Sequence, residues 1–208
     1  MRGLYLITND DPIEQLLLKL DTALATGHIQ ILQYRRKKTP FAMQPIEVAE
    51  IQKLCDRYRV PFIINDNIAL AAEFGLGVHL GQTDGEIIDA KAQLPAGVII
   101  GKTCSNSLEF AEKAVHDGAT YVAFGAIYST LTKPSAGCIG VDILKQARQR
   151  FTLPICAIGG LTVENSQNVI HAGADLCAVV SDILAQDVCD IATRVNAWAN
   201  LFNSKHNK

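Results

Sequence analysis

The stretch HDGATYVAFG, residues 116–125, ends a predicted helix at a glycine and enters an apolar strand within a few residues. The same arrangement returns in EFGLGVHLG (73–81) and in HAGADLCAVV (171–180). Glycine adopts the left-handed conformation that closes many helices, so each stretch predicts a junction between a helix and a strand. The strands are apolar throughout and do not alternate, which indicates burial on both faces and therefore a parallel sheet.

Eight short apolar runs predict strands at 3–8, 29–34, 62–64, 77–80, 98–103, 121–125, 155–160 and 176–181. Segments with helical periodicity separate the strands and predict helices at 12–25, 44–58, 67–74, 86–93, 107–117, 141–150, 162–172 and 187–202. Before the first helix, Asp11 and Pro12 have the pattern of an N-cap followed by proline at the first helical position.

Eight strand–helix units predict an α/β protein with one domain over residues 1–208, a single-domain (β/α)8 TIM barrel with its active site at the carboxyl ends of the strands. The alternative is an open doubly wound sheet, which usually has fewer strands and a glycine-rich first turn. The first turn here reads TNDDP, so the barrel is favoured.

The composition limits the partners. Nineteen Lys and Arg against 21 Asp and Glu give a net charge of −2, which argues against a nucleic-acid partner because such binding needs a basic surface. No apolar stretch approaches the length of a membrane span, and the first residues lack a signal-peptide pattern. Six cysteines without a C-x-x-C pair suit a reducing, cytoplasmic compartment. A homo-oligomer is compatible with this sequence.

Polar side chains gather directly after the strands, and in such a barrel the loops after the strands share the face that holds the active site. After the second strand, Gln33, Arg35 and Lys37 alternate, and every second side chain of an extended segment points the same way. They predict an anchor for a phosphate group. Considered alone, the run QYRRKK is also typical of a solvated basic surface.

Carboxylates follow the next two strands. Asn65 and Asp66 end the third strand, and Asp84 follows the fourth. Two carboxylates from neighbouring strand ends predict a Mg²⁺ site completed by phosphate oxygens of a substrate. The alternatives are an N-cap role for Asp66 and a turn role for Asp84. His79 lies within its strand, which favours a packed, hydrogen-bonded histidine over a ligand.

Three later loops add groups that suit a second phosphate. The loop after the sixth strand offers two hydroxyls and an ammonium, at Thr130, Thr132 and Lys133, although its composition is also that of an ordinary loop. Gly160 after the seventh strand and Val180 and Ser181 after the eighth occupy the usual phosphate position of this fold. The alternative is a tight glycine turn with Ser181 as a helix cap. Two phosphate zones on one face predict phosphorylated small-molecule substrates.

Together these motifs resemble those of the thiamine-phosphate synthase family, from LYLIT (4–8) to AVVSDI (178–183). The resemblance rests on the Gln-x-Arg-x-Lys pattern at 33–37, the Asn-Asp pair at 65–66, GVHLGQTD (77–84), TLTK (130–133), AIGG (157–160) and VVS (179–181). It implies a transferase that joins a pyrimidine-methyl pyrophosphate to a thiazole phosphate. In that family the bond to pyrophosphate breaks first, and the thiazole nitrogen traps the resulting pyrimidine cation.

The resemblance also implies ligand sets. Those for the pyrimidine pyrophosphate are Gln33, Tyr34, Arg35, Arg36, Lys37, Asn65, Thr103 and Lys133. Those for the thiazole phosphate are Thr130, Thr132, Gly160, Val180 and Ser181, and those for Mg²⁺ are Asp66 and Asp84. No general base is implied beyond these binding residues.

Three positions depart from the family pattern. Arg36 stands where the family has an acidic residue, so it either adds positive charge near the pyrophosphate or points away from it. Thr103 replaces a serine and Ser129 a proline. A thiazole tautomerase relative is the alternative within this fold, but it typically has histidine where Ala126 stands. A non-catalytic sensor of phosphorylated ligands would need no paired carboxylates.

Overall fold

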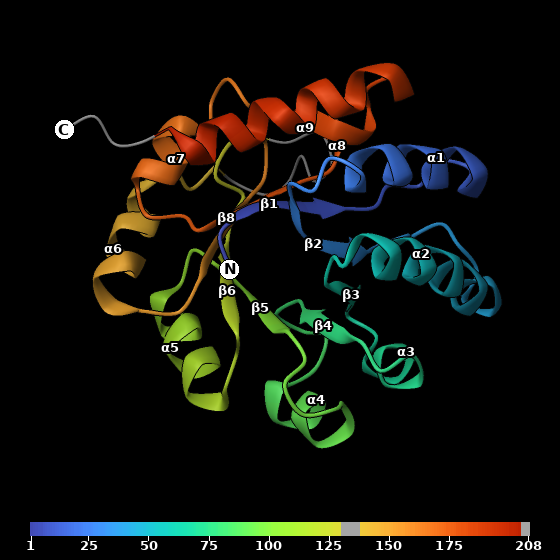
Figure 1. The fold of residues 1–208 in the computed structure, drawn as a ribbon. Helices are drawn as coiled ribbons and strands as arrows, with labels where there is room; N and C mark the ends of the chain where they lie inside the picture. The colour runs from blue at the N-terminus through green and yellow to red at the C-terminus, as the bar shows by residue number, and fades with distance from the viewer. Residues whose placement is uncertain (130–137, 205–208) are drawn as a thin grey trace.

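The chain forms a barrel of parallel strands surrounded by helices (Figure 1). The structure is a computed structural model, and it describes residues 1–129 and 138–204. Its strands are β1 (Gly3–Ile7), β2 (Ile29–Tyr34), β3 (Phe62–Asn65), β4 (Gly77–Leu80), β5 (Ile100–Ser105), β6 (Tyr121–Phe124), β7 (Ile155–Ile158) and β8 (Leu176–Val179). They pair in chain order, and β1 also pairs with β8, so the predicted (β/α)8 barrel is confirmed.

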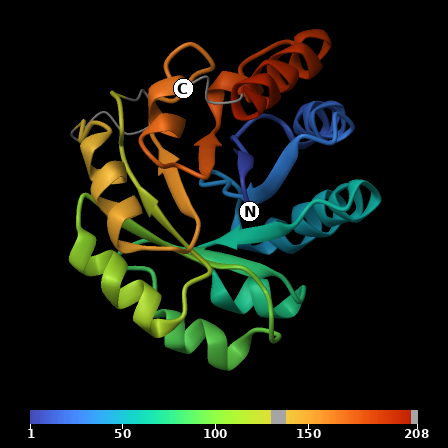
Figure 2. The same cartoon turned by 60° about the vertical axis from the view of Figure 1, so that its left-hand side comes forward.

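Helices cover the outside of the barrel (Figure 2). They are α1 (Ile13–Leu24), α2 (Gln44–Tyr58), α3 (Ile68–Glu73), α4 (Ile87–Gln93), α5 (Leu108–Asp117), α6 (Asp142–Arg150), α7 (Gln167–His171), α8 (Ser181–Leu184) and α9 (Val188–Asn203), with a 3-10 turn, η1, at Phe41–Met43. In the described part of the chain, no helix is both long and apolar enough to cross a membrane.

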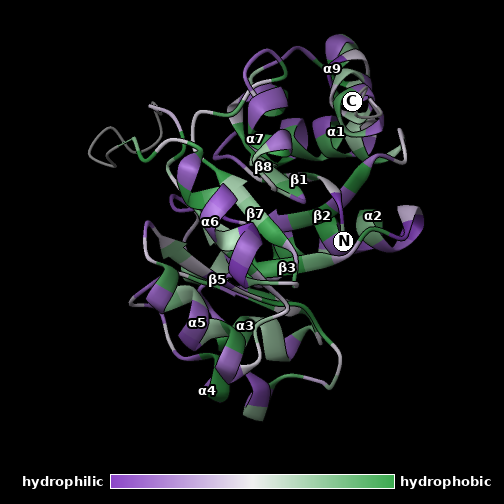
Figure 3. Cartoon of the chain, turned by 90° about the vertical axis from the view of Figure 1, so that its left-hand side faces the viewer, coloured by the Kyte–Doolittle hydropathy of each residue, from purple (hydrophilic) through white to green (hydrophobic). Residues whose placement is uncertain are grey.

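The strands bury both faces because successive side chains point to opposite sides. One set fills the barrel interior and includes Tyr5, Ile31, Tyr121 and Cys156. The other packs against the helices and forms the larger core. Figure 3 shows the strands largely hydrophobic, whereas the helices alternate between hydrophobic and hydrophilic residues. The apolar strand runs of the sequence therefore reflect burial from two sides.

The glycine junctions have the predicted geometry at the end of α5. Gly118 has a φ of 98° and follows the last residue of that helix. Its amide donates to the carbonyl of Val115, and the next amide, of Ala119, donates to Ala114. β6 then begins at Tyr121.

Two predicted helix starts are wrong. α1 begins at Ile13 after Pro12, and the Asp11 carboxylate does not cap it because it accepts a hydrogen bond from Lys19 Nζ at 2.8 Å. α7 begins at Gln167, five residues later than predicted at 162. The Asn165 side chain accepts from the Thr162 amide at 2.9 Å, which closes a turn where a helix was expected.

Candidate active site

A cavity of about 610 Å³ opens at the carboxyl ends of the strands. It brings together most of the residues that the sequence predicts for the site. The cavity is lined by Gln33, Arg35, Lys37, Asn65, Asp66 and Thr103 from the predicted pyrophosphate zone, and by Gly160, Val180 and Ser181 from the second phosphate zone. Thr130, Thr132 and Lys133 lie outside the described residues.

The end of β2 aims alternate side chains into this cavity. Gln33 is buried and donates from Nε2 to Asn65 Oδ1 at 3.3 Å, which links β2 to β3. Arg35 is fixed through its backbone, since its amide donates to Thr8 Oγ1 at 2.8 Å. The guanidinium of Arg35 and the exposed ammonium of Lys37 therefore face the cavity as two cations on one edge.

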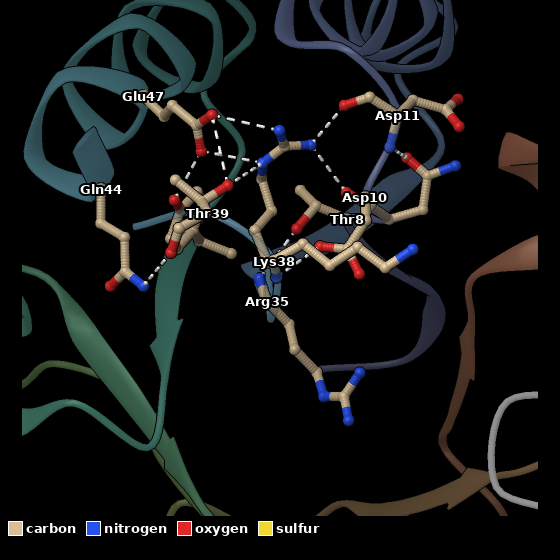
Figure 4. A network of polar contacts seen from close by, with 11 residues as sticks. Thr8, Asp10, Asp11, Arg35, Lys38, Thr39, Gln44 and Glu47 are labelled. Atoms are coloured by element: carbon tan, nitrogen blue, oxygen red, sulfur yellow. Dashed lines mark hydrogen bonds and ion pairs between the residues drawn. The ribbon is translucent and has the colours of Figure 1, made fainter. Parts of the chain in front are cut away.

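The side chains of Tyr34 and Arg36 point the other way, which is the second of the two alternatives given for Arg36; their place among the pyrophosphate ligands stays a prediction. The Tyr34 hydroxyl donates to Glu47 Oε2 at 2.6 Å, and Arg36 Nε donates to the same oxygen at 2.8 Å. Arg36 Nη1 also donates to the carbonyls of Asn9 and Asp11, at 2.9 and 2.7 Å. Figure 4 shows Arg35 pointing away from this network. The period of two along a strand separates the neighbours.

The Asp66 carboxylate is held at the end of β3. Asp66 has a φ of 62°, a left-handed conformation that aspartate tolerates better than most residues. Its Oδ1 accepts from the Gly81 amide at 2.9 Å, and its Oδ2 accepts from Asn65 Nδ2 at 2.5 Å. The helix cap is the next residue, because Asn67 Oδ1 accepts from the Leu70 amide. The alternative in which Asp66 caps α3 is therefore excluded.

The Asp84 carboxylate lies beside that of Asp66. A Cβ atom at Gly81 would collide with Asp84 Oδ2 and would stand 3.4 Å from Asp66 Oδ1. Glycine at this position leaves room for the two carboxylates as they lie here. In the described part of the chain, the Asp84 carboxylate has no hydrogen-bond partner, although its amide donates to Gly81 in a turn. Two adjacent carboxylates with free oxygen lone pairs are a fitting donor set for Mg²⁺.

No cluster of three or more His, Cys, Asp or Glu side chains suited to a metal occurs among residues 1–129 and 138–204. A metal held by Asp66 and Asp84 would need further oxygens from substrate and water, which is the usual arrangement for Mg²⁺.

Lys102 on β5 holds the loop that carries Asp84. Its Nζ donates to the carbonyls of Gly81 and Gly85, at 2.8 and 2.7 Å.

The second phosphate zone is built from close-packed backbone. Gly160 has a φ of 65°, and a Cβ there would collide with the carbonyl of Ser129.

Asp182 lines the cavity just after Ser181. Its carboxylate accepts hydrogen bonds from Arg194 at 2.5 and 3.0 Å and from Trp198 Nε1 at 2.7 Å. α9 thus holds the start of α8 in place. Sequence reasoning missed Asp182 because its partners lie on a helix 12 and 16 residues away.

Arg194 extends this contact to the loop after β7. It forms a bidentate pair with Glu164 at 2.6 and 2.8 Å. These hydrogen bonds lower the pKa of Glu164 to about 2. The loops after β7 and β8, which line the second phosphate zone, are therefore tied to one guanidinium.

His79 is packed and hydrogen-bonded, as its place within β4 predicts. Its Nδ1 lies 2.7 Å from Tyr121 Oη and its Nε2 lies 2.8 Å from Thr103 Oγ1. Burial lowers the pKa of His79 to about 4, and the charges of Lys102 and Arg35 act in the same direction. The imidazole is therefore neutral near pH 7.

Other cavity residues carry no signal in the sequence. Ser105, Ser129, Thr162 and Gln186 line the cavity, but each stands in an ordinary polar loop or strand end. Only closure of the barrel brings them to one cavity.

A family model described as thiamine monophosphate synthase matches residues 4–183. Among solved structures, a thiamine phosphate pyrophosphorylase from Pyrococcus furiosus is 28% identical, with 97% of this chain and 95% of that chain covered and a TM-score of 0.84. A thiamine phosphate pyrophosphorylase from Bacteroides thetaiotaomicron is 19% identical over 99% of this chain and 100% of its own, with a TM-score of 0.68. The 3-hexulose-6-phosphate synthase from Salmonella typhimurium, 17% identical over 99% and 100% with a TM-score of 0.73, shares the fold.

Proposed function

The chain belongs to the thiamine monophosphate synthase family, and we propose how its cavity carries out the synthesis of thiamine phosphate. The enzyme is a transferase. Its reaction breaks the C–O bond between the pyrimidine methylene carbon and the pyrophosphate. It forms a C–N bond from the thiazole nitrogen to that carbon, and pyrophosphate leaves with the electron pair of the broken bond. The observation that carries this proposal is that Arg35, Lys37 and Asp66 line one cavity, with the Asp84 carboxylate beside that of Asp66.

At one end of the cavity, Gln33, Arg35, Lys37 and Asn65 bind the pyrophosphate of the pyrimidine substrate. The two cations stabilise the negative charge that grows on the leaving group as the C–O bond breaks. A Mg²⁺ ion on Asp66 and Asp84 would supply further positive charge to the same oxygens. Thr103 contacts this substrate, and Lys133 contributes a further cation.

At the other end, the backbone of Gly160, Val180 and Ser181 binds the phosphate of the thiazole substrate, with the hydroxyls of Thr130 and Thr132. Both substrates bound in one cavity in this way would bring the thiazole nitrogen to the methylene carbon. An ionisation followed by capture of the cation needs no general base. Positioning and charge stabilisation therefore account for the catalysis.

We also assign the enzyme to the cytoplasm. The six cysteines are free thiols, which supports a reducing compartment.

The test is a coupling assay with purified protein, both phosphorylated substrates and Mg²⁺, in which thiamine phosphate is followed by mass spectrometry. We expect Mg²⁺-dependent product, and a loss on the order of 100-fold or more in Asp66→Asn and Asp84→Asn. The matched control is Asp142→Asn, a carboxylate with 79% of its side chain exposed on α6, which should keep full activity.

Absence of product from folded wild-type protein with intact substrates would overturn the synthase assignment. Full activity of both site variants would overturn the carboxylate and metal roles while leaving the reaction in place.

A further inference from the structure

One arginine joins the two loops that form the second phosphate zone. Arg194 belongs to α9, which packs against α8 (Figure 1). Its guanidinium donates to the carboxylate of Asp182 at 2.5 and 3.0 Å and to that of Glu164 at 2.6 and 2.8 Å. Among the described residues, Asp182 lines the cavity and Arg194 does not. Arg194 therefore touches the wall of the cavity without reaching a bound substrate.

The direction of these hydrogen bonds follows from the groups themselves. A guanidinium and an indole N–H can only donate, and an ionised carboxylate can only accept. Asp182 Oδ2 accepts from Arg194 Nε and also from Trp198 Nε1 at 2.7 Å, while its Oδ1 accepts from Arg194 Nη2. Only 5% of the Asp182 side chain is exposed. The carboxylate is thus held from one side by donors on α9.

The contact with Glu164 leads to Gly160. The next residue, Asn165, accepts at Oδ1 from the Thr162 amide at 2.9 Å and donates from Nδ2 to the Gly160 carbonyl at 2.8 Å. These partners, an N–H and a carbonyl, permit one orientation of the Asn165 amide. The Glu164 side chain is 67% exposed, so its pair with Arg194 contributes less than the buried pair does.

The position of Asp182 creates an electrostatic problem for a phosphate site. Its carboxylate follows Ser181 directly and lines the same cavity as Gly160 and Val180. Like charges repel more strongly in a partly buried site than in water, so an unpaired carboxylate there would oppose the binding of a phosphate. The positive charge of Arg194 offsets that of Asp182.

We propose that Arg194 is a positioning residue for the second phosphate zone. It offsets the charge of the Asp182 carboxylate and holds the loops after β7 and β8, so that the cavity binds the phosphate of the thiazole substrate. This inference rests on the proposed function, because it assigns that phosphate to this end of the cavity. The effect is specific to phosphate, and a thiazole with a free hydroxyl in its place gains nothing from Arg194.

Calorimetric titration tests this without turnover. The ligands are the thiazole phosphate, the corresponding thiazole alcohol and inorganic phosphate. Arg194→Met should weaken the binding of both phosphate ligands on the order of tenfold or more, the effect of displaced binding groups, and leave the binding of the alcohol unchanged. Arg194→Lys should lose less, because an ammonium keeps the charge but lacks the planar fork that pairs with two carboxylates. Arg194→Met/Asp182→Asn should recover part of the phosphate affinity, since no unpaired carboxylate remains.

The matched control is Arg148→Met at the other end of the barrel. Arg148 pairs with Asp175 at 2.7 Å, with side chains 33% and 25% exposed, and Asp175 directly precedes β8. Neither residue lines the cavity in the described part of the chain. Arg148→Met should lower the melting temperature and leave the binding of all three ligands unchanged.

Kinetics add a readout that a general loss of stability would not move. Arg194→Met should raise KM for the thiazole phosphate by the same factor as its dissociation constant, with KM for the pyrimidine pyrophosphate unchanged. An equal rise in both KM values would overturn the proposal.

Unaltered phosphate binding in folded Arg194→Met would overturn it too, as would an equal loss for the phosphate and the alcohol. Should Arg194→Met fail to fold, Arg194→Lys decides in the same way. If the wild type makes no thiamine phosphate, the proposed function fails, whereas the phosphate titrations still decide the role of Arg194.

Discussion

Removing the guanidinium of Arg36 should destabilise the enzyme far more than removing an exposed one. Arg36 and Glu47 form a pair at 2.8 Å, with 7% and 10% of their side chains exposed. Arg36→Met leaves the Glu47 carboxylate buried without its cation, and breaking such a pair costs about 3–5 kcal/mol. At about 2–4 °C per kcal/mol for a domain of this size, the melting temperature should fall by about 6–20 °C.

The assay is urea unfolding followed by circular dichroism, together with thermal melting. Arg150→Met is the matched control, because Arg150 pairs with Glu112 at the surface with side chains 52% and 53% exposed. That pair should contribute at most about 1 kcal/mol. Arg36→Met/Glu47→Met should recover part of the loss, since no buried charge remains. If Arg36→Met lowers the free energy of unfolding no more than Arg150→Met does, the reasoning about burial is refuted.

Three further predictions concern other parts of the molecule. A Cβ at Gly101 would collide with the Tyr121 ring, so Gly101→Ala should push that ring aside and lower the free energy of unfolding in urea by about 1–3 kcal/mol; an unchanged value would contradict the packing. Because the pKa of Glu164 is lowered from 4.5 to about 2 in the folded protein, its ion pair stabilises the fold fully above pH 4.5, and this stabilisation is lost as the pH falls through about 2. In Glu164→Gln the free energy of unfolding should therefore depend less on pH in this range; an unaltered slope would count against the ion pair. In an absorbance assay, a thiol reagent should modify two cysteines rapidly in the native protein and the other four only on unfolding. Burial raises the pKa of those four thiols and so keeps them unreactive. Fast reaction of more than two cysteines in the native protein would contradict this prediction. The two exposed cysteines are Cys138 and Cys189.

The barrel could be predicted from the sequence because its signal is local and repeated. Each apolar run is short, and several are preceded by a helical segment that ends near a glycine, as at Gly118. Helix starts were less predictable, because a cap depends on which partner an acidic side chain finds. Asp11 finds Lys19, eight residues ahead, and gives up the cap position. No pattern within four residues contains that information.

The strand pattern predicted where several site residues lie, but it did not predict the residues that hold them in place. Gln33, Arg35 and Lys37 could be placed on one side from the period of two alone. Lys102 was missed because it lies in β5 and its acceptors are backbone carbonyls of another loop. Any residue type supplies a carbonyl, so no composition signal marks such a contact.

Arg36 shows why a motif has to be considered together with its partners. A third cation in the run 35–37 would raise the positive potential at the pyrophosphate if it faced the cavity. Its guanidinium instead lies against the Glu47 carboxylate on α2, and that negative charge offsets its own. The cavity therefore receives two cations from this strand end, the same number that the alternation of Arg35 and Lys37 requires. A substitution at position 36 changes the packing of β2 against α2 and reaches the reaction only through the placement of its neighbours. An acidic side chain at 36 would face the Glu47 carboxylate and the carbonyls of Asn9 and Asp11, so these surroundings favour a basic side chain there.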